Sequence, residues 1–143
     1  MKKALLLLLT AVLLFSAATF CAWAEEPAAE KEAVVRLPSS TLYTHAELLD
    51  AAAQVCREFD AWEGCELHSI RYAGDASSTA ENLKWMNELN QDGNYTQVAA
   101  FLMDFHSPVK GGGAWEPDKE YTDYEFWLAR STDGGWDLLT WGY

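Results

Sequence analysis

Three side chains with acid–base chemistry occur close together in the second half of the chain. Asp104 and His106 alternate along the apolar run "YTQVAAFLMDFHS", and Glu125 lies in the strand-like run that follows. Alternate residues of a strand share a face, so Asp104 and His106 are predicted to be neighbours, and Glu125 can join them from the next strand. Carboxylates and imidazoles perform general acid–base catalysis. A small hydrolase or isomerase is therefore one hypothesis for the function.

No nucleophile accompanies these three groups, and Asp104 and His106 are equally well explained as the polar end of a strand that emerges into solvent. An Asp-x-His pair supplies two ligands, whereas a zinc site needs three or four. Gly111 to Gly113 do not lead into a helix amino terminus, as a phosphate-binding loop does. We therefore expect no catalytic residues, metal or cofactor, and we favour a non-catalytic binding or interaction domain.

Two tryptophans are the candidate binding residues. Strand parity places Trp127 and Trp136 on the same sheet face as Asp104, His106 and Glu125. Large rigid aromatic side chains are enriched at recognition surfaces. This face needs a cover, which could be a short helix, a ligand or a partner subunit.

The opposite face of the C-terminal hairpin is assigned to the core. With a loop over residues 132–135, Phe126 lies opposite Trp141 and Leu128 opposite Leu139, while Gly142 lies opposite Glu125. Trp141 and Tyr143 are then core residues. A shift of one residue would exchange the two faces.

The elements that position these residues follow a helix, strand, helix and three-strand order. A capping box, Thr44 and Glu47, opens a helix over about 45–60, and a second box, Ser78 and Glu81, opens a shorter helix to about Leu89. Strands are predicted over 65–74, from about 95 to 106, and in the two arms of the hairpin. The order predicts an α+β domain in which the first helix packs on an antiparallel sheet of about four strands.

The amino terminus has the pattern of an export signal. Lys2 and Lys3 precede an apolar run, and Ala22-Trp23-Ala24 forms a small-x-small cleavage site, so residues 1–24 are predicted to be a signal peptide. Lipid attachment at Cys21 is the alternative to plain secretion. Residues 25–41 are predicted to be a flexible leader, and 42–143 a single domain.

Export also bears on the two remaining cysteines. Disulfides persist in oxidising compartments, and Cys56 and Cys65 lie at the end of the first helix and the start of the next strand. The alternatives, a metal pair or a catalytic thiol, lack nearby partners. A structural disulfide is therefore expected.

The charge excludes two classes of partner. The formal net charge is −12, whereas nucleic acids and anionic membrane surfaces select basic patches. We expect no nucleic acid and no membrane span. A neutral or cationic peptide, glycan or protein, or a second copy of the chain, is the partner that this composition favours.

The runs "FDAWEGCELHSIRYAGD", "GGGAWEPDKEYTDYEFWLAR" and "DGGWDLLTWGY" resemble small exported proteins of Gram-positive gut bacteria that form an uncharacterised domain family. Their general plan is similar to the cystatin-like (nuclear-transport-factor-2-like) α+β domains. That resemblance implies a curved sheet wrapped partly around helices, with one face available as a pocket and the other for dimerisation. It implies no catalytic residues.

Overall fold

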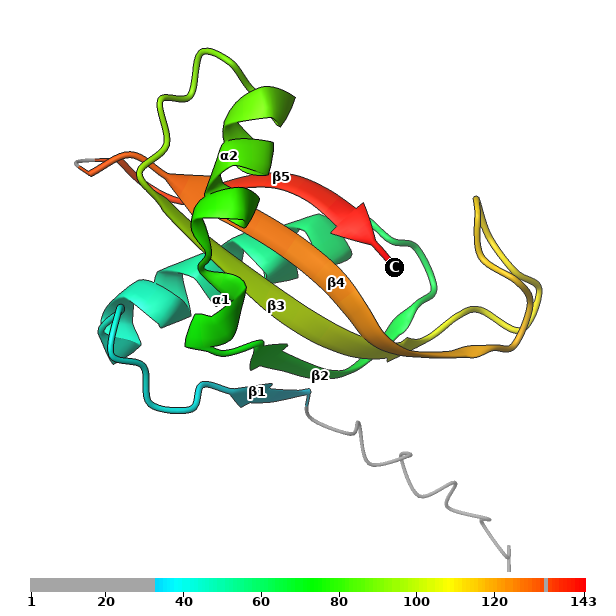
Figure 1. The fold of residues 1–143 in the computed structure, drawn as a ribbon. Helices are drawn as coiled ribbons and strands as arrows, with labels where there is room; N and C mark the ends of the chain where they lie inside the picture. The colour runs from blue at the N-terminus through cyan, green and yellow to red at the C-terminus, as the bar shows by residue number, and fades with distance from the viewer. Residues whose placement is uncertain (1–32, 133) are drawn as a thin grey trace, which may run out of the picture. The chain divides into compact units, whose positions relative to one another are not determined.

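The computed structural model describes residues 33–132 and 134–143 (Figure 1). They belong to one compact unit that spans Lys31–Tyr143. The predicted signal peptide, Cys21 and residues 25–32 of the predicted leader lie outside the described residues.

The unit is an α+β fold with two α-helices and a five-stranded sheet. The strands lie in the order β1-β2-β3-β4-β5, and all neighbours are antiparallel except β1 and β2, which are parallel. The helices and strands are β1 (Val34–Arg36), α1 (His45–Phe59), β2 (Glu66–Tyr72), α2 (Ala80–Leu89), β3 (Gln97–His106), β4 (Glu120–Arg130) and β5 (Asp137–Gly142). The α+β class is confirmed. The predicted antiparallel sheet of about four strands corresponds to β2–β5, but the whole sheet is mixed, because β1 adds a fifth, parallel strand that was not predicted. β1 was missed because three residues are too few to show a periodicity.

The two helices lie on opposite faces of the sheet (Figure 1). The predicted capping box of α1 is confirmed: Thr44 N donates to Glu47 Oε2 at 2.8 Å, and Glu47 N donates to Thr44 Oγ1 at 3.3 Å. One stripe of α1 is buried against the sheet and consists of Leu48, Ala51, Ala52, Val55 and Phe59. We call the sheet face under this stripe the α1 face, and the other the α2 face.

The second capping box is not formed as predicted. Thr79 caps α2 by accepting from Asn82 N at 3.1 Å, whereas Ser78 Oγ donates to the carbonyl of Val98 on β3 at 2.6 Å. α2 buries Met86 against β3 and β4, in a small second core with Tyr95, Val98 and Ala129. The short helix is therefore one cover of the α2 face.

A cluster of aromatic rings forms the end of the α1-face core that α1 does not cover. Phe105 on β3 is its centre: its ring is stacked on Tyr121 with centroids 4.8 Å apart, and it meets Trp115 edge-on at 5.1 Å. The other members are Phe59, Trp62, Tyr124 and Phe126. Trp62 and Trp115 come from connecting segments, so the loops complete the core where the helix ends.

The register of the C-terminal hairpin agrees with the prediction at one end only. Phe126 lies opposite Trp141, and Glu125 opposite Gly142, as expected. An irregularity between Trp127 and Leu128 then changes the pairing, so that Leu128 lies opposite Leu138 instead of Leu139. A bulge of this kind places two residues of one strand against one of the other and reverses the parity beyond it.

The bulge moves Trp136 to the α1 face, so the prediction that it shares a face with Trp127 is wrong. Its side chain is buried in the main core at 5% exposure, and its Nε1 donates to the carbonyl of Glu47 at 3.0 Å. Trp141 and Tyr143 do lie beside core rings, Phe126 and Tyr124. They are nevertheless exposed, at 41% and 80%, because β5 is an edge strand.

Cys56 and Cys65 are free thiols, so the predicted disulfide is wrong for this structure. Each side chain is partly buried against the main core. Burial raises the pKa of both thiols, with Asp60 adding to the effect at Cys56. A raised pKa lowers the fraction of reactive thiolate. The cellular compartment and the spacing of two cysteines do not determine where each sulfur packs.

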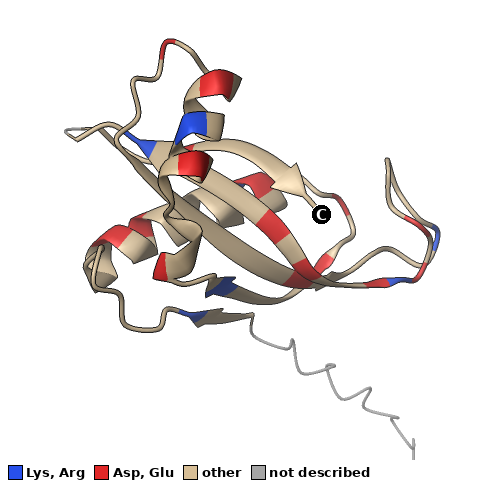
Figure 2. Ribbon diagram, in the orientation of Figure 1, with Lys and Arg blue, Asp and Glu red and all other residues tan. Residues whose placement is uncertain are grey.

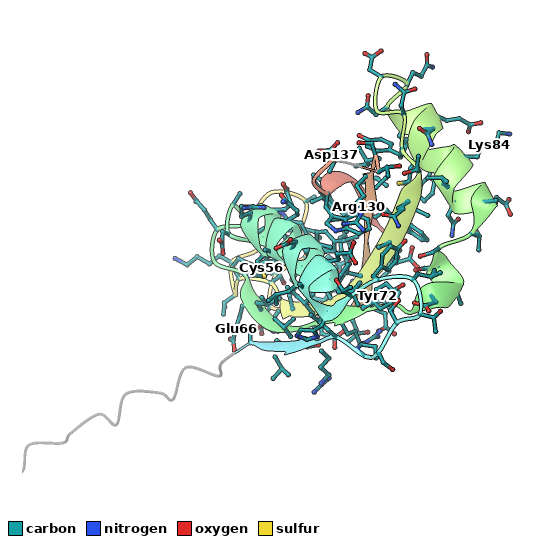
Figure 3. All side chains as sticks on the ribbon, turned by 90° about the vertical axis from the view of Figure 1, so that its left-hand side faces the viewer. Cys56, Glu66, Tyr72, Lys84, Arg130 and Asp137 are labelled. Atoms are coloured by element: carbon teal, nitrogen blue, oxygen red, sulfur yellow. The ribbon has the colours of Figure 1, made fainter. Side chains whose placement is uncertain are left out.

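An ion pair joins α1 to β4. The guanidinium of Arg130 binds Glu47 and lies over the ring of Trp136, with its central carbon 4.6 Å from the ring centroid. Figure 3 shows Arg130 between α1 and the sheet. Hydrogen bonds from the Thr44 backbone and from Arg130 lower the pKa of Glu47 from 4.5 to about 2.

Because of the Glu47–Arg130 ion pair, we expect the folded state to lose stability at acid pH. A carboxyl group whose pKa is lower in the folded state stabilises the fold above its unfolded pKa, and that contribution is lost as the pH falls through the folded pKa. Between pH 4.5 and 2 the melting temperature of Glu47→Gln should therefore fall less steeply than that of the parent protein. Thermal unfolding over this range checks it, with Glu88→Gln on the exposed face of α2 as the control. Parallel curves for parent and Glu47→Gln would contradict the role assigned to this pair.

Candidate functional site

The α2 face is covered by α2 at one end and open at the other. Beside the covered part lies a cleft of about 130 Å³ between α2 and the last two strands. We call it the Trp85–Trp127 cleft; it is lined by Trp85, Glu125, Trp127, Thr140, Trp141, Gly142 and Tyr143. The cleft therefore contains two of the five predicted binding residues, Trp127 and Glu125.

Two indoles and one carboxylate determine the chemistry of the cleft. The rings of Trp85 and Trp127 meet edge to face, with centroids 5.4 Å apart. Trp127 Nε1 donates to Glu125 Oε2 at 2.9 Å, which fixes the carboxylate beside the ring. Trp127 is half-buried, and Trp85 is 38% exposed. The cleft thus presents aromatic surface and a positioned negative charge together.

The charge of Glu125 is not neutralised by a neighbour in the described residues. A row of paired residues crosses the α2 face in the order Arg71, Leu102, Glu125 and Gly142. Arg71 is the nearest basic residue of this row, but it lies two strands from Glu125, about 10 Å at the usual strand spacing, and it pairs with Asp123. No ion pair of Glu125 occurs among residues 33–132 and 134–143.

Gly142 keeps the space beside Glu125 open. The two residues are paired across β4 and β5, so their side chains would project on the same face. A Cβ atom at Gly142 would meet no atom within 4 Å. The missing side chain therefore leaves one edge of the cleft unfilled.

Asp104 has a structural partner on each carboxylate oxygen. Oδ2 accepts from Ser69 Oγ at 2.8 Å, and Oδ1 accepts from the backbone N–H of Asp123 at 2.9 Å. Asp123 has a φ of 57° and lies where the β3–β4 register shifts. Asp104 thus accepts the backbone N–H of Asp123 in an irregular part of the β3–β4 ladder. Its role is therefore structural.

His106 lies further along the same strand. Its Nε2 is 3.5 Å from Asp118 Oδ1, and its ring is nearly parallel to that of His68, with centroids 6.5 Å apart. His68 Nδ1 lies 2.8 Å from Glu120 Oε1. No hydrogen bond or ion pair in the described part of the chain joins Asp104, His106 and Glu125 to one another. Each has its own partner, as expected for a polar sheet surface.

Sequence reasoning missed a second hollow, which lies beside the aromatic cluster. It has a volume of about 690 Å³ and is lined by Ala61, Trp62, Glu63, Gly64, Pro108, Gly111, Gly112, Gly113 and Trp115. The rings of Trp62 and Trp115 are 4.8 Å apart. Both rings pack against the main core, so the aromatic wall of this hollow is already in contact with other side chains of the protein.

The sequence predicts Trp85 only as part of the cover over Trp127. The sequence contained one usable signal: Trp85 and Met86 are adjacent on a helix, so they project about 100° apart, and a surface that buries one fully leaves the other near the margin of the covered face. Met86 is fully buried, and Trp85 lies at the margin. Glu125 and Gly142 were correctly paired by register, but nothing in the pattern showed that they border a cleft.

Comparisons with protein-family models, with curated proteins and with solved structures found no match to this chain. Within the described residues, neither helix has the length and apolar character of a membrane span. In the same residues, no three histidine, cysteine or acidic side chains converge to hold a metal ion.

Proposed function

We propose that this protein is an exported, non-catalytic binding domain that holds a neutral or cationic partner in the Trp85–Trp127 cleft. The observation that carries the proposal is the pair of indoles beside an unneutralised carboxylate in an open cleft. Partly exposed tryptophans supply large contact area at low entropic cost. The partner is a peptide, a glycan or another protein, including a second copy of this chain.

The charge distribution supports a partner that is not anionic. Figure 2 shows acidic residues in the first and last turns of α2 and along β4, and both elements contribute residues to the cleft lining. The overall net charge of −12 adds to this field. Electrostatic complementarity increases association rates and excludes like-charged partners. Nucleic acids are accordingly not expected as ligands, and export itself rests on the sequence of residues 1–24.

We also propose a distant relation to cystatin-like (nuclear-transport-factor-2-like) domains and to the exported family of Gram-positive gut bacteria. The packing of α1 on one face of the antiparallel strands β2–β5 supports it. α2 on the opposite face and the parallel strand β1 are additions to that plan.

The proposal predicts a ligand response at Trp85 and Trp127. Indole N–H signals can be followed by NMR while a disaccharide, a neutral peptide and a basic peptide are added separately. At least one probe should shift the signals of Trp85 and Trp127 and leave buried Trp136 unchanged. Trp85→Ala should weaken that binding about fivefold and barely alter the melting temperature, because Trp85 is at the surface.

Two results would contradict the proposal. One is that no probe of any class shifts the Trp85 and Trp127 signals. The other is that every responding probe acts on Trp62 and Trp115, which would move the binding site to the second hollow.

A further inference from the structure

Glu125 is the one acidic side chain among the residues that line the Trp85–Trp127 cleft, and it is incompletely satisfied there. Its Oε2 accepts from Trp127 Nε1, whereas Oε1 has no hydrogen-bond partner in the described residues. No side-chain oxygen or nitrogen among those residues is both buried and unpaired. Oε1 is therefore accessible to solvent and free to accept a hydrogen bond from a ligand.

The surroundings of Glu125 favour a planar cation over a compact one. Trp85 and Trp127 lie at 69° to each other, so they present indole surface in two directions beside the carboxylate. A guanidinium group stacks on aromatic faces and donates to carboxylates through a fork of N–H groups. An ammonium group makes the charge contact, but it is more strongly hydrated and has no planar face.

The described basic residues in the row of Glu125 and on α2 have partners of their own. Arg71 is held by Asp123, and the side chain of Leu102 lies between it and Glu125 in the same row. Lys84 on α2 pairs with Glu88 at 3.5 Å. A partner therefore has to bring the positive charge with it.

Resting on the proposed function of the cleft, we propose that its ligand is an arginine side chain of a peptide or protein partner. The guanidinium donates to Glu125 Oε1 and lies against the indoles of Trp85 and Trp127. The open position at Gly142 gives the arginine stem a way into the cleft without displacing a side chain. No covalent step is involved, and the specificity is for charge and planarity.

The test uses two capped peptides that differ in one group. In the first, a single arginine is flanked by glycine and serine; in the second, citrulline, its neutral isostere, replaces it. The dissociation constant is measured from the NMR shifts of the Trp85 and Trp127 indole signals. The arginine peptide should bind about tenfold more tightly than the citrulline peptide, because citrulline lacks the positive charge that the Glu125 carboxylate attracts. Added salt should reduce this difference.

Variants assign the effect to Glu125. Glu125→Gln keeps an oxygen that accepts from Trp127 Nε1 but removes the charge, so the preference for arginine should disappear while the melting temperature is retained. Glu88→Gln removes the same charge from α2 outside the cleft lining, and it should keep most of the preference. A lysine peptide should bind more weakly than the arginine peptide.

The outcomes separate this inference from the proposed function. Equal binding of arginine and citrulline peptides, or tighter binding of a disaccharide, would overturn the arginine assignment and leave the cleft as the site. Shifts of the same signals with protein concentration alone would show that a second copy is the occupant. Absence of any response at the two indoles, with peptides and sugars alike, would overturn both proposals.

Discussion

Trp136→Ala should destabilise the protein by about 3–5 kcal/mol, the usual range when a large aromatic side chain is removed from a core. The indole is buried, meets Tyr43 edge-on at 5.4 Å, and lies under the guanidinium of Arg130. Its Nε1 also donates to the carbonyl of Glu47. Alanine removes all of these contacts and leaves a cavity between α1 and β5. The free energy of unfolding is measured by urea denaturation.

Trp141→Ala, on β5, is the matched control for Trp136, which directly precedes that strand. Trp141 is 41% exposed and touches the core along one side, so its replacement should cost about 1 kcal/mol. This contrast also tests the hairpin register, because an unbulged β5 would place Trp136 on the α2 face. A small effect of Trp136→Ala, equal to that of Trp141→Ala, would show that the bulge is absent in solution.

Phe105→Ala should cost a similar amount, about 3–5 kcal/mol, and should also loosen the long segment between β3 and β4. The ring of Phe105 is fully buried and contacts both Tyr121 and Trp115. Trp115 belongs to that segment, so its docking depends on the ring beneath it. Hydrogen exchange should become faster around Trp115, beyond the effect of lower global stability.

Two further variants serve as controls for Phe105→Ala. Phe105→Leu keeps most of the apolar volume and should cost about 1.5 kcal/mol or less. Val109→Ala alters a residue of the same segment that is 73% exposed, and it should leave both stability and exchange nearly unchanged. Uniform acceleration of exchange across the whole domain in Phe105→Ala would contradict a specific link between Phe105 and the segment.

The sequence was sufficient for the elements that have strong local signals. α1 has a capping box and an amphipathic stripe, and the predicted helix agrees with the observed one to a residue at its end. The pairs Phe126–Trp141 and Glu125–Gly142 followed from alternation alone. Local rules work here because each depends on spacing along one chain segment.

The errors have a different origin. A β-bulge is an extra residue in a ladder, and nothing in the run "WDLLTWG" shows where it is inserted, yet it decides whether Trp136 lies on the α1 face or on the α2 face. The thiols of Cys56 and Cys65 depend on how neighbouring rings pack. The cleft required knowing where α2 stops covering Trp127. These three features depend on tertiary packing, which the periodicity of the sequence does not determine.

The anchoring of α1 has a consequence for the order of events during synthesis. Glu47 is joined to Arg130 and Trp136, which follow it by 83 and 89 residues. α1 is made early, but its binding surface on β4 and β5 is made last among the described strands. A contact of such long range forms slowly, because a large loop must close first. The contacts of Glu47 with Arg130 and Trp136 therefore form only when this unit has been translated almost completely, whereas the packing of α1 on β2 can begin much earlier.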